Sequence, residues 1–165
     1  EFKPIFPEPE ALVGRVPRLT GIDGNAKMSK SRRNTIDLRD SAGTVAKKVR
    51  GMYGGPPRGA KEAGRVGENP IFLYLDAFDP NTAHVRDLKE RYEREGVSNK
   101  ELKDRLTSVL HELLEPMRER RANYESNMPR VREALEQGTK RGRVIARETM
   151  DLVRDALDVN YLGKY

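Results

Sequence analysis

The sequence contains no cysteine, which excludes disulfide bonds and metal sites built from thiolates. No apolar run approaches 18 residues and no signal peptide opens the chain, so we expect no membrane association and a cytoplasmic location. The sequence also lacks the G-x-x-x-x-G-K-[ST] pattern, which excludes a Walker-type phosphate site. It begins with Glu1 and clusters prolines near its start, as a connector does, so one interpretation is that the chain is a fragment.

Positive charge is in excess. The 165 residues include 32 Lys and Arg against 26 Asp and Glu, which gives a net charge of +6. A balance of this size permits a polyanionic partner without proving one. Hydrophobic residues make up only 36% of the chain, but they fall in periodic rows, which favours a folded domain over a disordered chain.

Helical periodicity dominates after residue 40, and no segment there predicts a confident strand. Capping signals predict helix starts at Asp40 or Ser41, at Asn69-Pro70, at residues 79–81 and at Ser98. Pro116 predicts a kink or division of one helix, and Gly138 with Thr139 predicts a break between two further helices. The fold class of this chain is therefore mainly α: a bundle of about five or six helices behind a loop-rich N-terminal piece.

The segment NAKMSKSRRN, residues 25–34, contains no acid and no aromatic residue, and it follows possible hinges at Gly21 and Gly24. When a nucleotide is transferred from ATP, negative charge develops on the departing pyrophosphate, and mobile ammonium groups such as those of lysine can stabilise it. Met28 can anchor such a loop in an apolar seat while its neighbours point outward. The alternative is a solvated basic turn, which composition alone favours.

Residues 27–31, Lys-Met-Ser-Lys-Ser, are identical to the KMSKS signature of class I aminoacyl-tRNA synthetases. Further segments resemble the C-terminal half of the bacterial-type tryptophanyl-tRNA synthetase family, in the same order along the chain. They are FPEP (6–9), RVPRLTGIDGNAKMSKS (15–31), NTIDL (34–38), AKKVRGMY (46–53), FLYLDAF (72–78) and LEPMRERRANYE (114–125). A colinear series of this length is hard to obtain by chance, and it favours the family over a solvated turn.

The resemblance implies an α/β family fold, with a Rossmann-type catalytic domain followed by a helical anticodon-binding domain, in a homodimer. Residues 1–40 would then be the C-terminal end of the catalytic domain, and residues 41–165 the anticodon-binding domain. It also implies the reaction: tryptophan is activated with ATP and Mg²⁺ and is then joined to tRNA(Trp).

By motif match, Lys30 would be the main ligand of the departing pyrophosphate, and Lys27 would support it. The resemblance further places Val16 close to the adenine. The implied ATP-binding residues are Val16, Lys27, Met28, Ser29, Lys30 and Ser31. No protein-bound metal is expected, because the acid pair Asp76 and Asp79 supplies too few ligands and suits capping and surface roles better.

Basic clusters on predicted helices are candidate contacts for tRNA phosphates. Their members are Arg118, Arg121, Lys140, Arg141, Arg143 and Arg147. Solvated helix faces, in part paired to glutamates, are an equally supported interpretation. Tyr124 and Tyr161 could stack on unpaired bases, although core packing is the favoured role for each.

The sequence departs from the family in what it lacks. The His-x-Gly-His type motif is not present; His84 and His111 are far apart on predicted helices, and nothing resembles the tryptophan pocket. We therefore expect the isolated chain to be inactive. Two alternatives stay open: another class I synthetase, with tyrosine as the nearest amino acid, and a noncatalytic helical RNA-binding module.

Overall fold

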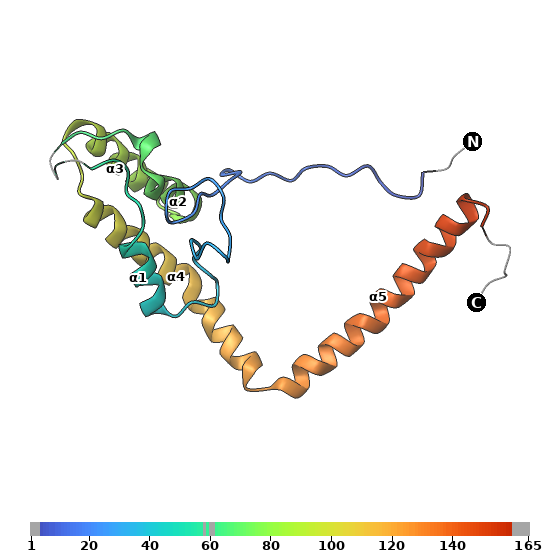
Figure 1. Ribbon diagram of the computed structural model, residues 1–165. Coiled ribbons are helices and arrows are strands. Elements are labelled where there is room, and N and C mark those ends of the chain that lie inside the picture. The colour runs from blue at the N-terminus through green and yellow to red at the C-terminus, as the bar shows by residue number, and fades with distance from the viewer. Residues whose placement is uncertain (1–3, 58, 60–61, 160–165) are drawn as a thin grey trace. The chain divides into compact units, whose positions relative to one another are not determined.

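The computed structural model describes residues 4–57, 59 and 62–159, and that part of the chain contains helices but no strand (Figure 1). The elements are α1 (Ala42–Arg50), a 3-10 turn (Val66–Glu68), α2 (Pro70–Phe78), α3 (Thr82–Arg94), α4 (Asn99–Glu125) and α5 (Met128–Ala156). The mainly α fold class is confirmed. Within the described ranges, every helix is too short or too polar to span a membrane. Val13–Arg121 forms one compact unit, and α5 belongs to another.

The predicted helix starts are confirmed, because each of four polar side chains accepts a hydrogen bond from a backbone N–H in the first turn. The caps are Ser41 for α1, Asn69 for α2, Asn81 for α3 and Ser98 for α4. Ser98 and Glu101 fit the S-x-x-E pattern of a capping box, in which each side chain bonds to the backbone N–H of the other residue, but only the bond accepted by Ser98 is formed. The Glu101 carboxylate accepts a hydrogen bond from Arg91 Nη2 at 3.1 Å instead of returning to the helix start.

The predicted helix break at Gly138 and Thr139 is wrong. α5 continues through Gly138 and Thr139, because a helical glycine costs only about 1 kcal/mol relative to alanine and helix formers surround it. α4 is continuous through Pro116, so the helix is not divided there, and the alternative of a kink stays a prediction. Pro116 lacks the N–H that would bond to the carbonyl of Glu112, but both residues are exposed, so water can satisfy that carbonyl.

The apolar core lies inside the unit of Val13–Arg121, among α1, α2, α3 and α4. The apolar segment of α2 is buried, and Phe72 packs edge-on against Tyr92 of α3 with ring centroids 4.9 Å apart. α4 buries an apolar stripe that includes Leu102, Leu106 and Leu110. α1 ends at Arg50, so Tyr53 lies beyond the helix, and its side chain is 43% exposed.

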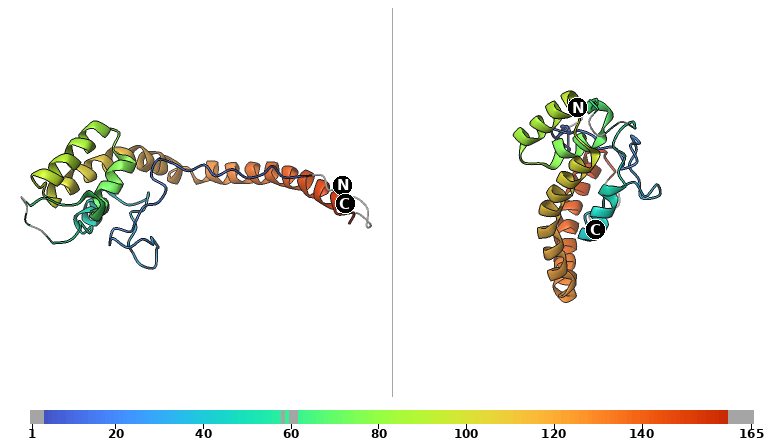
Figure 2. Two further views of the ribbon diagram at one scale, coloured as in Figure 1. Left: turned by 90° about the horizontal axis from the view of Figure 1, so that it is seen from above. Right: turned by 90° about the vertical axis from the view of Figure 1, so that its left-hand side faces the viewer.

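α1 lies alongside α4, as the turned views also show (Figure 2). Lys103 Nζ donates to the carbonyl of Arg50 at 2.9 Å, and a ring nitrogen of His111 lies 3.0 Å from the carbonyl oxygen of Ala42. His84 and His111 are on helices, as predicted, and His111 serves this helix contact. The contact fixes where the chain leaves the loop that precedes α1.

Asp79 ends α2 and joins it to α4 through an ion pair. Its side chain is 0% exposed, and Arg105 donates from Nε at 2.8 Å and from Nη2 at 2.7 Å. Burial disfavours the charged carboxylate, but the hydrogen bonds from Arg105 and the Asn81 N–H outweigh it, so the pKa of Asp79 is lowered. The helix-end role of Asp79 is confirmed, whereas the expected surface position is wrong.

We expect Asp79→Asn to lower the free energy of unfolding at pH 7 by about 2–3 kcal/mol, below the usual range for a fully buried pair because Arg105 is 29% exposed. The folded-state pKa of Asp79 is lowered, so the wild-type stabilisation is complete above the unfolded pKa and is lost as the pH falls through the folded pKa. Urea unfolding from pH 7 to pH 3 should therefore show a shrinking difference between wild type and variant.

The control is Asp76→Asn, which breaks an ion pair with Lys89 in which both side chains are about a third exposed. It should cost less than about 1 kcal/mol. A cost for Asp79→Asn that does not change with pH would contradict the assignment of the stabilisation to the charged pair.

Candidate functional site

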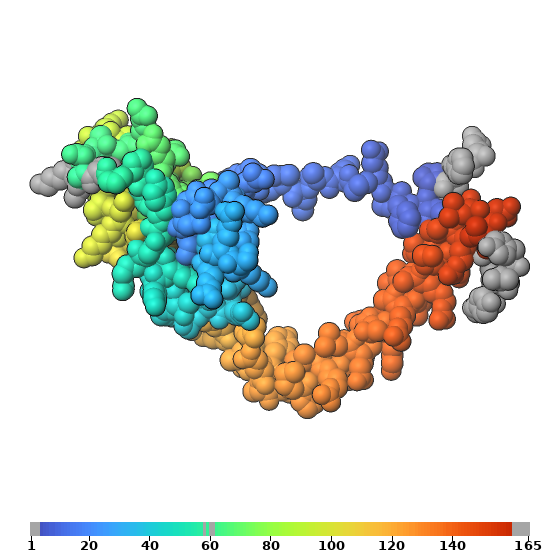
Figure 3. All heavy atoms as spheres, in the orientation of Figure 1, coloured from blue at the N-terminus to red at the C-terminus, as the bar shows by residue number. Residues whose placement is uncertain are grey.

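Residues 21–34 form the loop that carries the basic signature, and they lie at the surface of their unit (Figure 3). The loop is closed by backbone hydrogen bonds. The Gly21 N–H donates to the carbonyl of Asn25 at 2.8 Å, and the Ile22 N–H donates to the carbonyl of Asn34 at 2.9 Å. The second bond joins the two ends of the loop.

The Asn34 side chain holds the interior of this loop. It is one of three buried polar residues in the described part of the chain and is 2% exposed. Its Oδ1 accepts from the Ser29 N–H at 2.9 Å, and its Nδ2 donates to the Lys27 carbonyl at 3.0 Å and to Asp23 Oδ1 at 3.0 Å. Two of these bonds fix the backbone on either side of Met28.

Asp23 is the second organising side chain. Its Oδ2 accepts from Asn25 Nδ2 at 2.7 Å, and its Oδ1 accepts from the Asn25 N–H at 3.1 Å and from Asn34. The side-chain bonds, first from Asn25 and then from Asn34, lower the pKa of Asp23. Sequence reasoning missed both residues. Asp23 and Asn25 carry a turn signal that could have been recognised, whereas the role of Asn34 depends on the chain reversal.

Lys27 and Lys30 are exposed, and within the described residues no carboxylate lies within 4 Å of either ammonium. The hydroxyls of Ser29 and Ser31 lie 3.2 Å apart, and the Arg32 N–H donates to Ser29 Oγ at 3.3 Å. This part of the loop therefore presents ammonium groups and small hydroxyl donors to solvent, while the buried Asn34 side chain fixes its backbone. Such an arrangement can bind the oxygens of a phosphate chain.

Met28 is half-buried and packs against the apolar core, so the expected apolar seat is confirmed. A cavity of about 90 Å³ lies beside it, bounded by Ile36, by Phe78 of α2 and by Leu114 of α4, among others. The seat therefore joins the signature loop to two helices of the core.

The chain is also anchored on both sides of the loop. Before it, the Tyr74 hydroxyl donates to the Thr20 carbonyl at 2.5 Å, and burial together with the nearby Asp23 charge raises the pKa of Tyr74 to about 12. After it, Lys48 Nζ lies 2.6 Å from Asp40 Oδ2. The core helices thus fix where the loop begins and ends.

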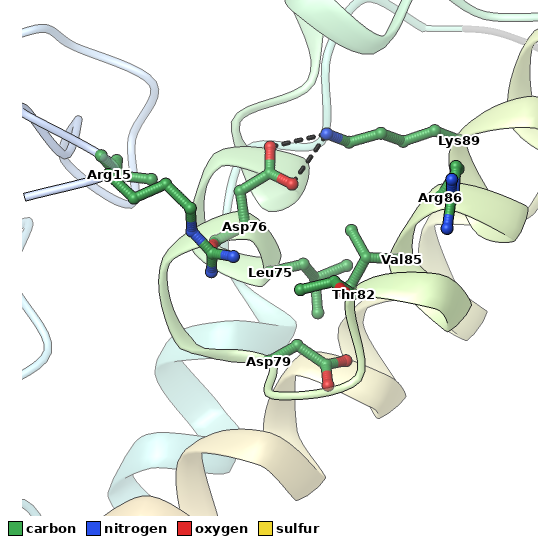
Figure 4. Close-up of a pocket in the computed structure, with 9 residues that line it drawn as sticks. Arg15, Leu75, Asp76, Asp79, Thr82, Val85, Arg86 and Lys89 are labelled. Carbon is green, nitrogen blue, oxygen red and sulfur yellow. Dashed lines mark hydrogen bonds and ion pairs between the residues drawn. The ribbon is translucent and has the colours of Figure 1, made fainter.

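Val16 lies away from the signature loop. It lines a cavity of about 570 Å³ whose other residues include Arg15, Asp76 and Lys89 (Figure 4). Lys89 donates to both carboxylate oxygens of Asp76 at 2.7 Å, and Arg15 donates to the Asp76 carbonyl. No residue of 27–31 lines this cavity. The structure as described does not bring Val16 together with the loop lysines, and its place near adenine stays a prediction.

The basic residues of α4 are partly engaged in contacts within the fold. The Arg118 side chain is 16% exposed, pairs with Glu115 at 2.5 Å and donates to the Asp40 carbonyl at 3.4 Å. Arg121 is exposed on the same helix. A tRNA role for either residue stays a prediction, and the Arg118 contacts give that side chain a structural role in any case.

The basic residues of α5 are more accessible. Lys140, Arg141, Arg143 and Arg147 are all exposed, and none has an ion-pair partner among the described residues. At helical spacing, Lys140, Arg143 and Arg147 share one face, whereas Arg141 lies off it. The opposite face carries exposed apolar side chains: Leu135, Ile145 and Leu152.

Tyr124 is 53% exposed, so its expected core role is wrong. The Arg130 guanidinium lies 6.0 Å from the centre of its ring, which is a cation–π distance. Tyr161 lies outside the described residues.

Comparisons with known proteins point in one direction. The family model for tRNA synthetases class I (W and Y) matches residues 1–115. The Tryptophan–tRNA ligase of Chlamydia caviae is 43% identical over 157 residues, which are 94% of this chain and 46% of that protein. The Tryptophan–tRNA ligase of Treponema pallidum is 45% identical over 157 residues, with 94% and 47% covered.

Among solved structures, the tryptophanyl-tRNA synthetase of Campylobacter jejuni complexed with ADP and tryptophan superposes with a TM-score of 0.73 at 27% identity. The match covers 93% of this chain and 48% of that one. The chain thus spans about half the length of the relatives it matches. A family model that covers more than half of the residues, together with relatives above 40% identity, shows that this chain belongs to the class I tRNA synthetases of the tryptophan and tyrosine type.

Proposed function

We propose that this chain is the C-terminal half of a tryptophan–tRNA ligase, which activates tryptophan with ATP and then joins it to tRNA(Trp). The observation that carries the proposal is the KMSKS segment itself, with the Lys27 and Lys30 ammonium groups exposed on a loop that buried Asn34 holds. The names of the relatives favour tryptophan over tyrosine. Membership of a synthetase family argues against a noncatalytic RNA-binding module.

The loop residues have defined parts in the activation step. The tryptophan carboxylate attacks the α-phosphorus of Mg²⁺-bound ATP, the bond from that phosphorus to the bridging oxygen breaks, and pyrophosphate departs with the charge. Lys30 would meet that charge as it develops, and Lys27 would support it, because a flexible ammonium can follow a moving phosphate. The Ser29 and Ser31 hydroxyls and the Met28 backbone would line the phosphates. Val16 would lie near the adenine.

Transfer to tRNA needs a second, extended contact. A hydroxyl at the end of the tRNA attacks the activated carbonyl, and AMP leaves. The helical part of the chain, residues 41–165, would hold the anticodon end, with Lys140, Arg143 and Arg147 as phosphate contacts on one face of α5. Residues 1–40 would end the catalytic domain. The homodimer and the cytoplasmic location belong to the same proposal, and sedimentation of the full-length enzyme tests the first.

The reaction itself is tested by tryptophan-dependent exchange of pyrophosphate into ATP. We expect exchange from the full-length enzyme and none above background from the 165-residue chain alone, because a loop without an amino-acid pocket cannot preorganise the reactants. Tyrosine in place of tryptophan is the matched control. Exchange driven by tyrosine, or exchange by the isolated chain, would contradict the proposal.

For the loop, we expect Lys30→Ala in the full-length enzyme to slow adenylate formation by roughly 10²–10³-fold, comparable to the loss of one transition-state donor. ATP binding should change less, because the contact strengthens as charge leaves. Lys27→Ala should do less harm. Rapid-quench measurement of the first turnover checks both variants, and an unchanged rate in Lys30→Ala would remove this residue from the mechanism.

For α5, we expect Arg147→Glu to weaken tRNA binding and to reduce the salt dependence of the affinity by about one unit of slope, as the loss of one phosphate contact does. Pyrophosphate exchange without tRNA should be unchanged. Arg132→Glu is the control, since it makes the same charge change at an exposed site of α5 outside the cluster. Equal effects of the two variants would mean that charge at this helix acts nonspecifically.

A further inference from the structure

The feature that the proposed mechanism leaves unused is the buried amide of Asn34. It touches no position where a phosphate could bind, since it lies beneath the loop with 2% of its surface exposed. It nevertheless bonds to the backbone at Lys27 and at Ser29, which adjoins Lys30. The backbone at or next to both lysines assigned to the pyrophosphate is therefore held by one side chain.

We propose that Asn34 is the positioning residue of the signature loop, and that its uncharged amide, with one acceptor and two donors, sets where the Lys27 and Lys30 ammonium groups are presented. The expected effect of Asn34 on the rate of pyrophosphate exchange rests on the proposed function. The structural content of the inference, that the Asn34 amide fixes the loop, stands on the hydrogen bonds alone.

The chemistry of the site allows few substitutes. A backbone N–H on one side requires an acceptor, and a carbonyl together with a carboxylate on the other side require donors. Only a side chain with both kinds of group satisfies all three. Aspartate has nearly the same shape as asparagine, but it would place a carboxylate where Nδ2 now lies 3.0 Å from Asp23 Oδ1, and it would leave the Lys27 carbonyl without its donor.

Gly21 supplies a second observation. A Cβ atom at this position would lie 2.2 Å from Asn34 Nδ2 and 2.5 Å from Asp23 Oδ1. The Asn34 amide therefore occupies the space that a side chain at residue 21 would need. It fits there only because Gly21 has no side chain. Gly21→Ala would displace Asn34 without changing its chemistry, which gives an independent way to disturb the same contact.

The experiment measures the loop in two ways in the full-length enzyme, for wild type, Asn34→Asp, Asn34→Ala and Gly21→Ala. The first readout is trypsin cleavage after Lys27, Lys30, Arg32 and Arg33 under native conditions. We expect cleavage there to be faster by about tenfold or more, as the loss of one or two hydrogen bonds allows. The second readout is pyrophosphate exchange, in which kcat should fall by about 10- to 100-fold, with a smaller change in the KM for ATP.

The matched control is Asn69→Ala. Asn69 is equally buried and makes three side-chain hydrogen bonds, to Tyr92, Asn99 and Ile71, but none to residues 21–34. It should lower the melting temperature without faster cleavage of the loop and without a fall in kcat of the folded enzyme. The double variant Asp23→Asn with Asn34→Asp should recover part of the loss, because it removes the second carboxylate.

Three results would overturn the inference. They are loop cleavage in Asn34→Asp at the wild-type rate, a kcat loss that Asn69→Ala reproduces at equal melting temperature, and no recovery in the double variant. The cleavage readout does not depend on the reaction. If wild type shows no tryptophan-dependent exchange, the proposed function fails while the structural role of Asn34 is still decided.

Discussion

The backbone of residues 21–34 has no helix or strand ladder to satisfy its polar groups, so a side chain must take that part. The amide of Asn34 does so from beneath the loop, and the remaining features follow from it. Met28 can enter its apolar seat because the backbone on both sides is fixed. The Lys27 and Lys30 side chains can remain exposed, without ion-pair partners among the described residues, because the Asn34 amide fixes the backbone of the loop and their own contacts are not needed for that.

Local chemistry made the helices predictable. Capping depends only on the side chain at the helix start, as it does at Ser41, Asn69, Asn81 and Ser98. The spacing of apolar residues in α2 and α4 likewise indicates which side chains enter the core. The helix breaks that did not occur have the opposite character. Gly138 and Pro116 are helix breakers by preference, but their neighbours and exposed surroundings decided the outcome.

The signature lysines could be found from sequence because five consecutive residues carry that signal. Asn34 could not, since its importance arises from contacts with residues 23, 27 and 29 that exist only once the chain has turned back. The same holds for Asp79, whose partner Arg105 is 26 residues away on another helix. Sequence reasoning thus reached the groups that would meet the substrate and missed those that hold them.

The groups that hold the loop also decide how it responds to acid and alkali. Asn34 does not titrate, the pKa of Asp23 is lowered, and burial raises the pKa of Tyr74 from 10.0 to about 12. The Tyr74 phenol donates only while protonated, so its contribution is complete below about pH 10 and is lost as the pH rises through the folded pKa. Between about pH 5 and pH 9 none of these three groups changes charge. A pH dependence of activation in that range would therefore report on the reactants and on the residues that touch them.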